Sequence, residues 1–212
     1  MVKWYDASLP LEEGMLSFPG DPAFECRQIF QTSTGDSFNL SALRMGSHTG
    51  THIDPPAHYI AGGQTVDEIR PEVLVGPAIV LDLRSEGCID RRALESSDLQ
   101  GYKRILFKTG NGRKLLQRQF TQDYVYVTED GAEFLVEYGA ALVGIDYLSI
   151  ERYVNEGAPV HRRLLGAGII VVEAVNLINV PEGPCEIFCL PLKIRHGDGA
   201  PARVVIRTQV SY

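Results

Sequence analysis

The sequence predicts an α/β fold in a single domain, and three observations carry this prediction. From residue 77 onward, apolar runs of strand length alternate with segments of helical periodicity, as in proteins built on a partly parallel sheet. The segments toward both ends indicate longer strands joined by turns. No low-complexity linker, charge block or repeat divides the 212 residues. We therefore expect one domain, 1–212, with a mixed β-sheet, helices packed on it and additional β-strands.

Apolar runs define the expected strands. In the α/β part these are residues 77–83, 104–108, 141–145 and 169–172. The last run is nearly all apolar, which predicts a central strand covered on both faces. Longer strands are expected over residues 38–52, 185–194 and 202–210. The turn-forming segment 196–201 joins the last two of these.

Three helices are expected between the strands, and capping residues mark two of them. Asp90 is placed to cap a short helix that ends at Leu94. Thr128, followed by acidic residues, predicts the start of a second helix. Gly139 predicts its end, because glycine readily adopts the left-handed conformation that terminates helices. The third helix is expected over residues 160–165.

Composition and charge narrow the class of partner. The formal net charge is −7 and the pI is near 5.2, and no basic stripe is present, so nucleic acids and anionic membranes are not the expected partners. No apolar run approaches the ~20 residues of a membrane span. The cysteines form no CxxC pair, and the first residues lack the apolar core of a signal peptide. We expect a cytoplasmic protein that acts on a small molecule.

The most informative segment is His48-Thr49-Gly50-Thr51-His52-Ile53-Asp54-Pro55-Pro56-Ala57-His58, which holds three of the five histidines. Its glycine, threonines and prolines oppose a helix, so an extended chain is expected. Alternation would then point His48, His52 and Asp54 to one face, with Gly50 leaving space for a cation. The prolines could turn His58 back over the same spot. This composition predicts a metal site and hydrolytic chemistry.

Two isolated polar residues could complete this site. His161 lies near the start of the third expected helix, and Glu173 directly follows an apolar strand. A carboxylate at the C-terminal end of a buried parallel strand is where α/β proteins commonly place ligands. Taken alone, His161 is better explained as an exposed first-turn residue, and Glu173 as a helix cap or the partner of Arg162 or Arg163. A functional role depends on joining them to the first cluster.

The histidine segment resembles the HxGTHxDxPxH signature of the cyclase family of metal-dependent hydrolases, which includes bacterial kynurenine formamidases and isatin hydrolases. Further similarities lie in segments 17–21, 143–146, 161–165, 172–173 and 190–193. The resemblance therefore spans nearly the whole chain. It implies the cyclase, or swivelling β/β/α-like, fold. It also implies a homodimer or higher homo-oligomer and a role in tryptophan catabolism.

Carried over residue by residue, the resemblance implies the metal ligands His48, His52, Asp54, His161 and Glu173. Asp54 would bridge two ions. The first ion would be held with His48 and His52, and the second with His161. Glu173 would contact one or both. Imidazole and carboxylate ligands without thiolate accommodate zinc, manganese or iron and do not choose among them, and of the three we expect zinc.

The implied reaction is hydrolysis of a small amide, most directly an aryl formamide such as N-formyl-L-kynurenine, which gives kynurenine and formate. Bound metal lowers the pKa of coordinated water to about 7. His58, with a pKa expected near neutrality, would be the general acid/base that protonates the departing nitrogen. One alternative is an isatin-type or other cyclic-amide hydrolase. Another is a non-catalytic metal-binding protein, against which a proton shuttle beside the ligands argues.

Two departures from the kynurenine formamidase pattern concern the substrate. Those enzymes place a tryptophan before the Pro-Gly-Asp turn, where this chain has Phe18, which still suits an aryl substrate. They also have Thr-Pro-Ser where this chain has Tyr147-Leu148-Ser149. The identity of the amide therefore stays open. The remaining histidine, His196, lies in a turn-forming segment and is expected to be an exposed loop residue.

Overall fold

The computed structural model of the protein describes residues 1–153 and 156–209. The strands of its main sheet are β1 (Val2–Asp6), β4 (His52–Asp54), β5 (Val75–Asp82), β6 (Arg104–Lys108), β7 (Leu142–Ile145), β8 (Ile170–Glu173), β9 (Gly183–Pro191) and β10 (Ala200–Gln209). In the described residues they follow the order β1-β10-β4-β8-β7-β6-β5-β9. Because β9 also pairs with β10, the sheet closes on itself like a barrel.

The sheet is mixed, as the sequence predicts. Strands β5, β6, β7 and β8 are parallel neighbours, whereas β4, β9 and β10 join them through antiparallel ladders. The four strands expected in the α/β part are confirmed within two residues at each end. The strand expected over 202–210 is β10, and Val210 lies outside the described residues. Strand β8 is buried along its length between β4 and β7, which confirms its central position.

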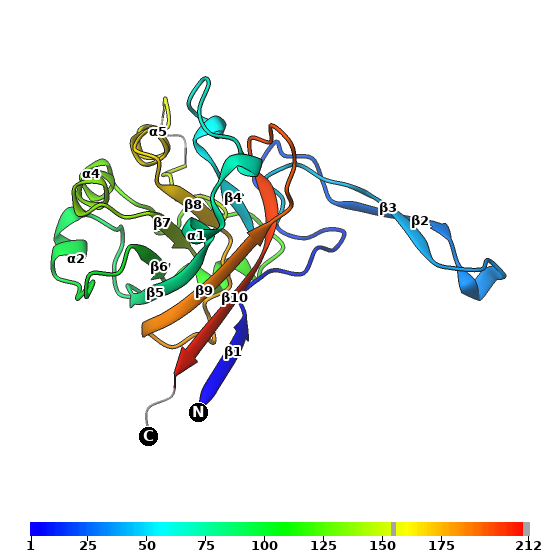
Figure 1. Cartoon of the computed structure of the whole chain (residues 1–212), viewed down its shortest axis with the longest axis horizontal. Coiled ribbons are helices and arrows are strands. Elements are labelled where there is room, and N and C mark those ends of the chain that lie inside the picture. The colour runs from blue at the N-terminus through cyan, green and yellow to red at the C-terminus, as the bar shows by residue number, and fades with distance from the viewer. Residues whose placement is uncertain (154–155, 210–212) are drawn as a thin grey trace.

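Three helices cover one face of the parallel strands (Figure 1). They are α2 (Arg91–Glu95), α4 (Glu129–Tyr138) and α5 (Pro159–Gly166). The expected caps are present. Asp90 accepts a hydrogen bond from the Ala93 N–H at 2.7 Å, and Thr128 accepts one from Gly131. Gly139 ends α4 with a φ of +72°.

Short helical segments occupy several connections. They are α1 (Pro71–Leu74), α3 (Gly112–Leu115) and the 3-10 turns η1 (Thr32–Thr34), η2 (Pro56–His58) and η3 (Val66–Glu68). None of the helices in the described residues has the length and apolar character needed to cross a bilayer. Of these segments, η2 consists of the last three residues of the histidine motif and therefore bears on the site.

Successive residues of the parallel strands belong alternately to two apolar cores. Ile79 and Ile105 pack toward the helices, while their neighbours Val80 and Leu106 pack inside the closed sheet. All four are at most 2% exposed. Because both faces are covered, these strands are continuous apolar runs and lack a polar face, which is the pattern that identified them in the sequence.

A separate hairpin extends away from the body of the molecule (Figure 1). Its strands, β2 (Glu25–Phe30) and β3 (Leu40–Arg44), pair antiparallel, and every residue in them is exposed. No pattern in the sequence indicates β1 or β2. The single strand expected over 38–52 is wrong, because the chain turns between β3 and β4. Gly50 adopts a φ of +67° in this turn, a left-handed conformation that interrupts a strand.

Candidate metal centre

The site forms where β4 and β8 lie side by side. His52 and Glu173 are direct partners in this antiparallel ladder, and Asp54 lies on the same face two residues beyond His52. The three residues are at most 4% exposed. His52 Nε2 lies 3.3 Å from Asp54 Oδ1 and 3.6 Å from Glu173 Oε2. The ladder therefore brings two carboxylates onto one buried imidazole.

His48 reaches the site from a turn and not from a strand. The alternation expected from His48 onward holds only from His52 to Asp54, because Gly50 is left-handed. His48 Nδ1 nevertheless lies 2.7 Å from Asp54 Oδ1. The expectation that Gly50 leaves space for a cation is also wrong. A Cβ at Gly50 would meet Leu11 Cδ2 at 2.8 Å, so the glycine makes room for the N-terminal segment and not for a cation.

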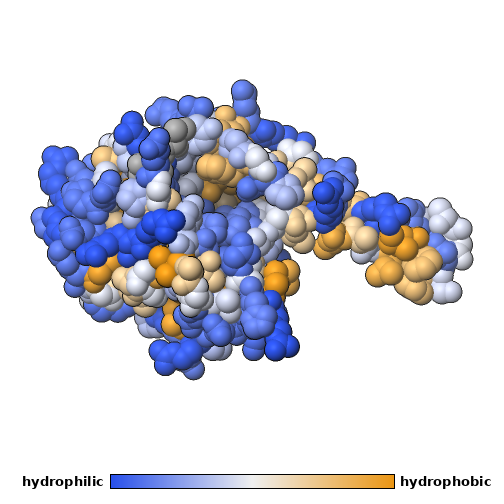
Figure 2. Space-filling model, turned by 90° about the horizontal axis from the view of Figure 1, so that it is seen from above, coloured by the Kyte–Doolittle hydropathy of each residue, from blue (hydrophilic) through white to orange (hydrophobic). Residues whose placement is uncertain are grey.

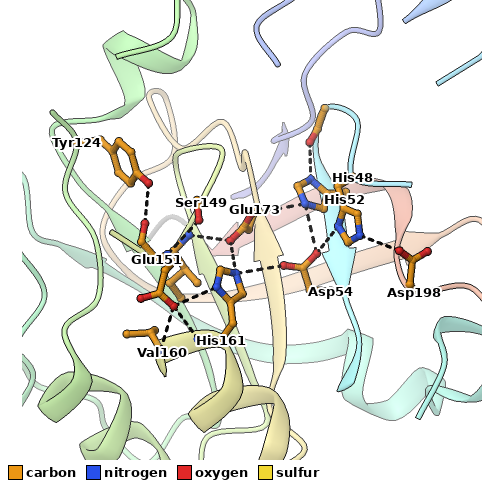
Figure 3. A network of polar contacts seen from close by, with 12 residues as sticks. His48, His52, Asp54, Tyr124, Ser149, Glu151, Val160, His161, Glu173 and Asp198 are labelled. Carbon is orange, nitrogen blue, oxygen red and sulfur yellow. Dashed lines mark hydrogen bonds and ion pairs between the residues drawn. The ribbon is translucent and has the colours of Figure 1, made fainter. Parts of the chain in front are cut away.

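Helix α5 places His161 on the opposite side of the site (Figure 3). His161 Nε2 lies 3.2 Å from Glu173 Oε1 and 3.7 Å from Asp54 Oδ2. His161 is 3% exposed, so its explanation as an exposed first-turn residue is wrong. Glu173 Oε1 also accepts a hydrogen bond from the Ile150 N–H at 2.7 Å. The two polar residues that the sequence left isolated thus join the histidine segment.

His58 folds back over the site through η2. Its N–H donates to the Pro55 carbonyl at 3.0 Å, which tightens the proline turn. The His58 ring lies 4.0 Å from the His48 ring and 6.1 Å from the His161 ring, measured between centroids. The expected return of this histidine is confirmed. His58 also offers a nitrogen within 4.8 Å of ligand atoms of His48 and Asp54, so its position suits a ligand as well as a proton carrier.

Burial and neighbouring carboxylates set the pKa values of the histidines. Burial alone would lower the pKa of His48 and His161. Hydrogen bonds to carboxylates, including Asp54 and Glu151, instead raise the pKa to about 9 in His48 and to about 10 in His161. Burial lowers the pKa of His58 to about 4, so the expectation of a value near neutrality is wrong. His58 is a neutral imidazole at neutral pH.

The arrangement fits a divalent metal ion. Asp54 Oδ2 is buried and has no hydrogen-bond partner in the part of the chain that the structure describes. Such an unpaired carboxylate oxygen is costly, and a cation beside it removes that cost. Ligand atoms of His52, Asp54 and Glu173 lie within 4.8 Å of one another. Imidazole and carboxylate donors of this kind suit zinc, manganese or iron.

A cavity of about 220 Å³ opens beside these donors. Phe18 lines it, packed edge-on against Phe120 with ring centroids 5.5 Å apart and against Tyr153 at 6.0 Å. Tyr59 lines it too and stacks on the His161 ring at 4.8 Å. The space beside the donors is therefore sized for a small molecule and has aromatic walls.

Three residues near the site are missing from the sequence prediction. Tyr59 is adjacent to the motif, so its position could have suggested it. Glu151 hydrogen-bonds His161, and Asp198 Oδ2 lies 3.5 Å from His48 Nε2. Asp198 lies far from His48 in the sequence, Glu151 lies ten residues before His161, and no local pattern marks either. The turn that carries Asp198 also carries His196, which is exposed, as expected.

The fold and the site together define an α/β protein with a buried His/Asp/Glu centre suited to a divalent metal, beside a cavity for a small molecule. The chain belongs to the cyclase family: the family model described as putative cyclase matches residues 5–152. The resemblance seen in the histidine motif is thereby confirmed.

Relatives agree with this membership. A kynurenine formamidase of Bacillus cereus is 35% identical over 205 residues, which cover 97% of each chain. A solved structure described as a potential metal-dependent hydrolase with cyclase activity has a TM-score of 0.86 and 36% identity, with 100% of both chains covered. Isatin hydrolase A from Ralstonia solanacearum has a TM-score of 0.84 at 23% identity, covering 98% of this chain and 92% of that chain. The last likeness shows a shared fold alone.

Proposed function

We propose that this protein is a metal-dependent amide hydrolase, and specifically an aryl formamidase that cleaves N-formyl-L-kynurenine to kynurenine and formate. The observation that carries the proposal is the buried donor set around Asp54, with His58 beside it and a cavity opening on both. The Bacillus cereus kynurenine formamidase, which aligns over 97% of this chain, supports the choice of substrate. The whole chain, 1–212, would act as one domain.

The proposed ligands, His48, His52, Asp54, His161 and Glu173, would hold two metal ions, with Asp54 shared by both. Asp54 Oδ1 faces His48 and His52, and Asp54 Oδ2 faces His161. Glu173 lies near both His52 and His161 and would contact one ion or both. We favour zinc, which binds imidazole and carboxylate readily. Bound there, a divalent metal would supply Lewis-acid activation of water and of the substrate carbonyl.

His58 is proposed as the general acid/base. As a neutral imidazole it can take a proton from the attacking water. It can then return that proton to the departing nitrogen, without which the amide would re-form. A histidine whose pKa lies low transfers the proton readily once it has accepted it.

Phe18 is proposed to contact the aryl ring of the substrate. It lies on the cavity wall together with Tyr59 and the donor histidines. Phe120 and Tyr153 support it from behind, which fixes its orientation. Aromatic pairs of this kind contribute roughly 0.5–1.5 kcal/mol beyond the area they bury. The wall therefore favours an aryl formamide over an aliphatic amide.

Metal content and a substrate panel test the proposal together. Elemental analysis of the purified protein should find a divalent transition metal, and N-formylkynurenine should be hydrolysed faster than isatin or a hydantoin. Turnover of isatin without turnover of formyl aryl amines would move the assignment to a cyclic-amide hydrolase. Bound metal with no turnover of any amide would indicate a metal-binding protein without catalysis.

A homodimer or higher homo-oligomer is part of the proposal, and the hairpin of β2 and β3 supports it. An isolated two-stranded hairpin is marginally stable in water. This one carries exposed apolar side chains, visible in Figure 2, that include Phe30, Phe38 and Leu43. An apolar groove at its base, lined by Leu11 and Leu192 among others, offers a matching surface on a second copy.

Light scattering coupled to gel filtration tests the assembly. The wild-type chain should elute with the mass of two or more copies, and Phe38→Asp should shift it toward the monomer. Leu116→Asp is the matched control, since Leu116 is about equally exposed but follows α3 and is not part of the hairpin. A wild-type monomer at micromolar concentration would remove the oligomer from the proposal.

The proposed setting is a reducing cytoplasm, where the reaction would serve tryptophan breakdown. The four cysteines are free in the structure, and Cys189 is buried in β9. Burial raises the pKa of Cys185, to about 12, and of Cys189. Thiols held protonated in this way support packing and not chemistry.

A further inference from the structure

Glu151 is a buried carboxylate outside the proposed ligand set. It is 6% exposed and lies in the loop between β7 and α5. One of its oxygens, Oε2, accepts hydrogen bonds from the backbone N–H groups of Val160 and His161, at 3.0 and 3.1 Å. The same oxygen lies 3.3 Å from His161 Nδ1 (Figure 3). Glu151 thus contacts both the backbone and the ring of one proposed ligand.

The backbone contacts explain how α5 begins. Its N-cap residue, Ala158, has a φ of +47° and no side chain that can cap a helix. Pro159 follows at the first helical position, where its missing N–H costs nothing. The next two N–H groups need an acceptor, and Glu151 supplies it from outside the helix. The position of His161 in the first turn therefore depends on Glu151.

The ring contact determines which nitrogen of His161 faces the site. An acceptor at Nδ1 favours the tautomer in which Nδ1 carries the proton and donates it to Glu151. Nε2, which lies 3.7 Å from Asp54 and 3.2 Å from Glu173, could then offer its lone pair to a metal ion bound beside these carboxylates. This is the geometry in which a carboxylate orients a metal-binding histidine from behind.

The loop that carries Glu151 also holds Glu173. The Ile150 N–H donates to Glu173 Oε1 at 2.7 Å, and the Glu151 N–H donates to Ser149 Oγ at 3.1 Å. Tyr124 donates its hydroxyl to the Glu151 carbonyl at 2.7 Å. Two of the donors proposed for the second ion, His161 and Glu173, are therefore positioned by one three-residue segment.

The other two histidine ligands have weaker outer partners. His52 Nδ1 lies 2.8 Å from the Gly50 carbonyl, which is uncharged. His48 Nε2 lies 3.5 Å from Asp198 Oδ2, whose side chain is 60% exposed. Of the three outer partners, Glu151 is the buried carboxylate. We propose that Glu151 is a positioning residue, which fixes His161 as an Nε2 ligand and so sets the affinity of the second metal ion.

This inference rests on the proposed metal centre, and metal titration of the whole chain tests it. Stripped wild-type protein, Glu151→Gln and Glu151→Ala are titrated with Zn²⁺ against a chromophoric chelator. Cobalt-loaded samples are compared by visible absorption, which reports the ligand set. Asp90→Ala is the matched control, because Asp90 also caps a helix start but lies at α2 and contacts no proposed ligand.

We expect Glu151→Ala to lower the affinity for the second ion by about tenfold to a hundredfold, the usual loss when an outer partner of a ligand is removed. Glu151→Gln keeps an acceptor oxygen without the charge. Its affinity for the second ion should therefore lie between those of Glu151→Ala and the wild type. Asp90→Ala should lower the melting temperature and leave both affinities unchanged. If Glu151→Ala does not fold, the loss of zinc affinity measured in Glu151→Gln tests the positioning role in its place.

Unchanged zinc affinity and an unchanged cobalt spectrum in the folded Glu151 variants would overturn the positioning role and leave Glu151 as a helix cap. Failure of the wild-type chain to bind zinc at all would instead overturn the metal centre itself. The two failures are distinguished within one titration series.

Discussion

His52 and Glu173 lie directly opposite each other in the ladder between β4 and β8, with His52 Nε2 3.6 Å from Glu173 Oε2. These residues are 121 positions apart in the sequence. Their pairing joins the histidine motif to the end of a central parallel strand. A site assembled in this way is as rigid as the sheet, because both side chains leave paired and buried backbone.

Replacing Asp54 should remove more metal than replacing His161. Asp54→Ala deletes the carboxylate that faces both sets of histidines and should lose both ions, whereas His161→Ala should lose one. Elemental analysis after gel filtration measures the difference. Asp6→Ala serves as a control, since Asp6 is an exposed carboxylate paired with Arg203. Equal metal content in Asp54→Ala and His161→Ala would exclude a bridging role.

His58→Ala should keep its metal while kcat falls by about 10²–10⁴-fold, the usual contribution of a positioned proton-transfer group. His52→Ala should lose both metal and rate, because a ligand supports the ion before it supports any step. Elemental analysis and steady-state kinetics on both variants check this. Loss of metal from His58→Ala would place His58 among the ligands, a role that its distance to His48 and Asp54 also allows.

Phe18→Ala should raise KM for an aryl formamide more than it lowers kcat, because stacking binds the ground state and the transition state alike. The expected loss of binding free energy is roughly 0.5–1.5 kcal/mol beyond the contribution of the buried area, and Phe18→Trp should restore it. Phe134→Ala, which removes an aromatic ring on α4 away from the cavity, is the control. A fall in kcat at constant KM would contradict a role in binding.

Much of the fold follows from the sequence, for identifiable reasons. The doubly covered strands are apolar runs, and the ends of α4 carry Thr128 and Gly139, whose local preferences do not depend on distant partners. The hairpin is not predicted as a unit, because β2 has no buried face and so no alternation marks it, while β3 falls within the longer strand expected over 38–52. The expected strand through Gly50 fails because a left-handed glycine and an extended one look alike in sequence.

The site is predictable where the motif is local. His52 and Asp54 share a face through strand alternation, and His58 returns through a proline turn. Glu151 is different, since its partner His161 lies ten residues away across a loop and a helix start. The low pKa of His58 could not be predicted either, because it arises from burial that only the fold creates.

Stability should depend on the ionisation of Asp146. Burial raises its pKa from 3.8 to about 6, despite two hydrogen bonds from Thr109. The folded state therefore binds the proton more tightly, and this contribution, full at low pH, is lost as pH rises through about 6. Asp146→Asn cannot ionise. Its stability relative to wild type should rise between about pH 4 and pH 7, by up to roughly 3 kcal/mol.

Chemical denaturation of both proteins across this pH range measures the difference. Asp82→Asn gives a control of opposite sign, because the hydrogen bond from Arg84 lowers the pKa of Asp82. That variant should lose stability relative to wild type as pH rises. Parallel profiles for wild type and Asp146→Asn would show that Asp146 is not perturbed.

The most direct test of the metal centre is the rate of N-formylkynurenine hydrolysis in stripped protein, measured as zinc is restored in known amounts. The account predicts no hydrolysis by the metal-free chain and a rate that rises with bound zinc until the donor set around Asp54 is filled. Full activity in rigorously metal-free protein would contradict it.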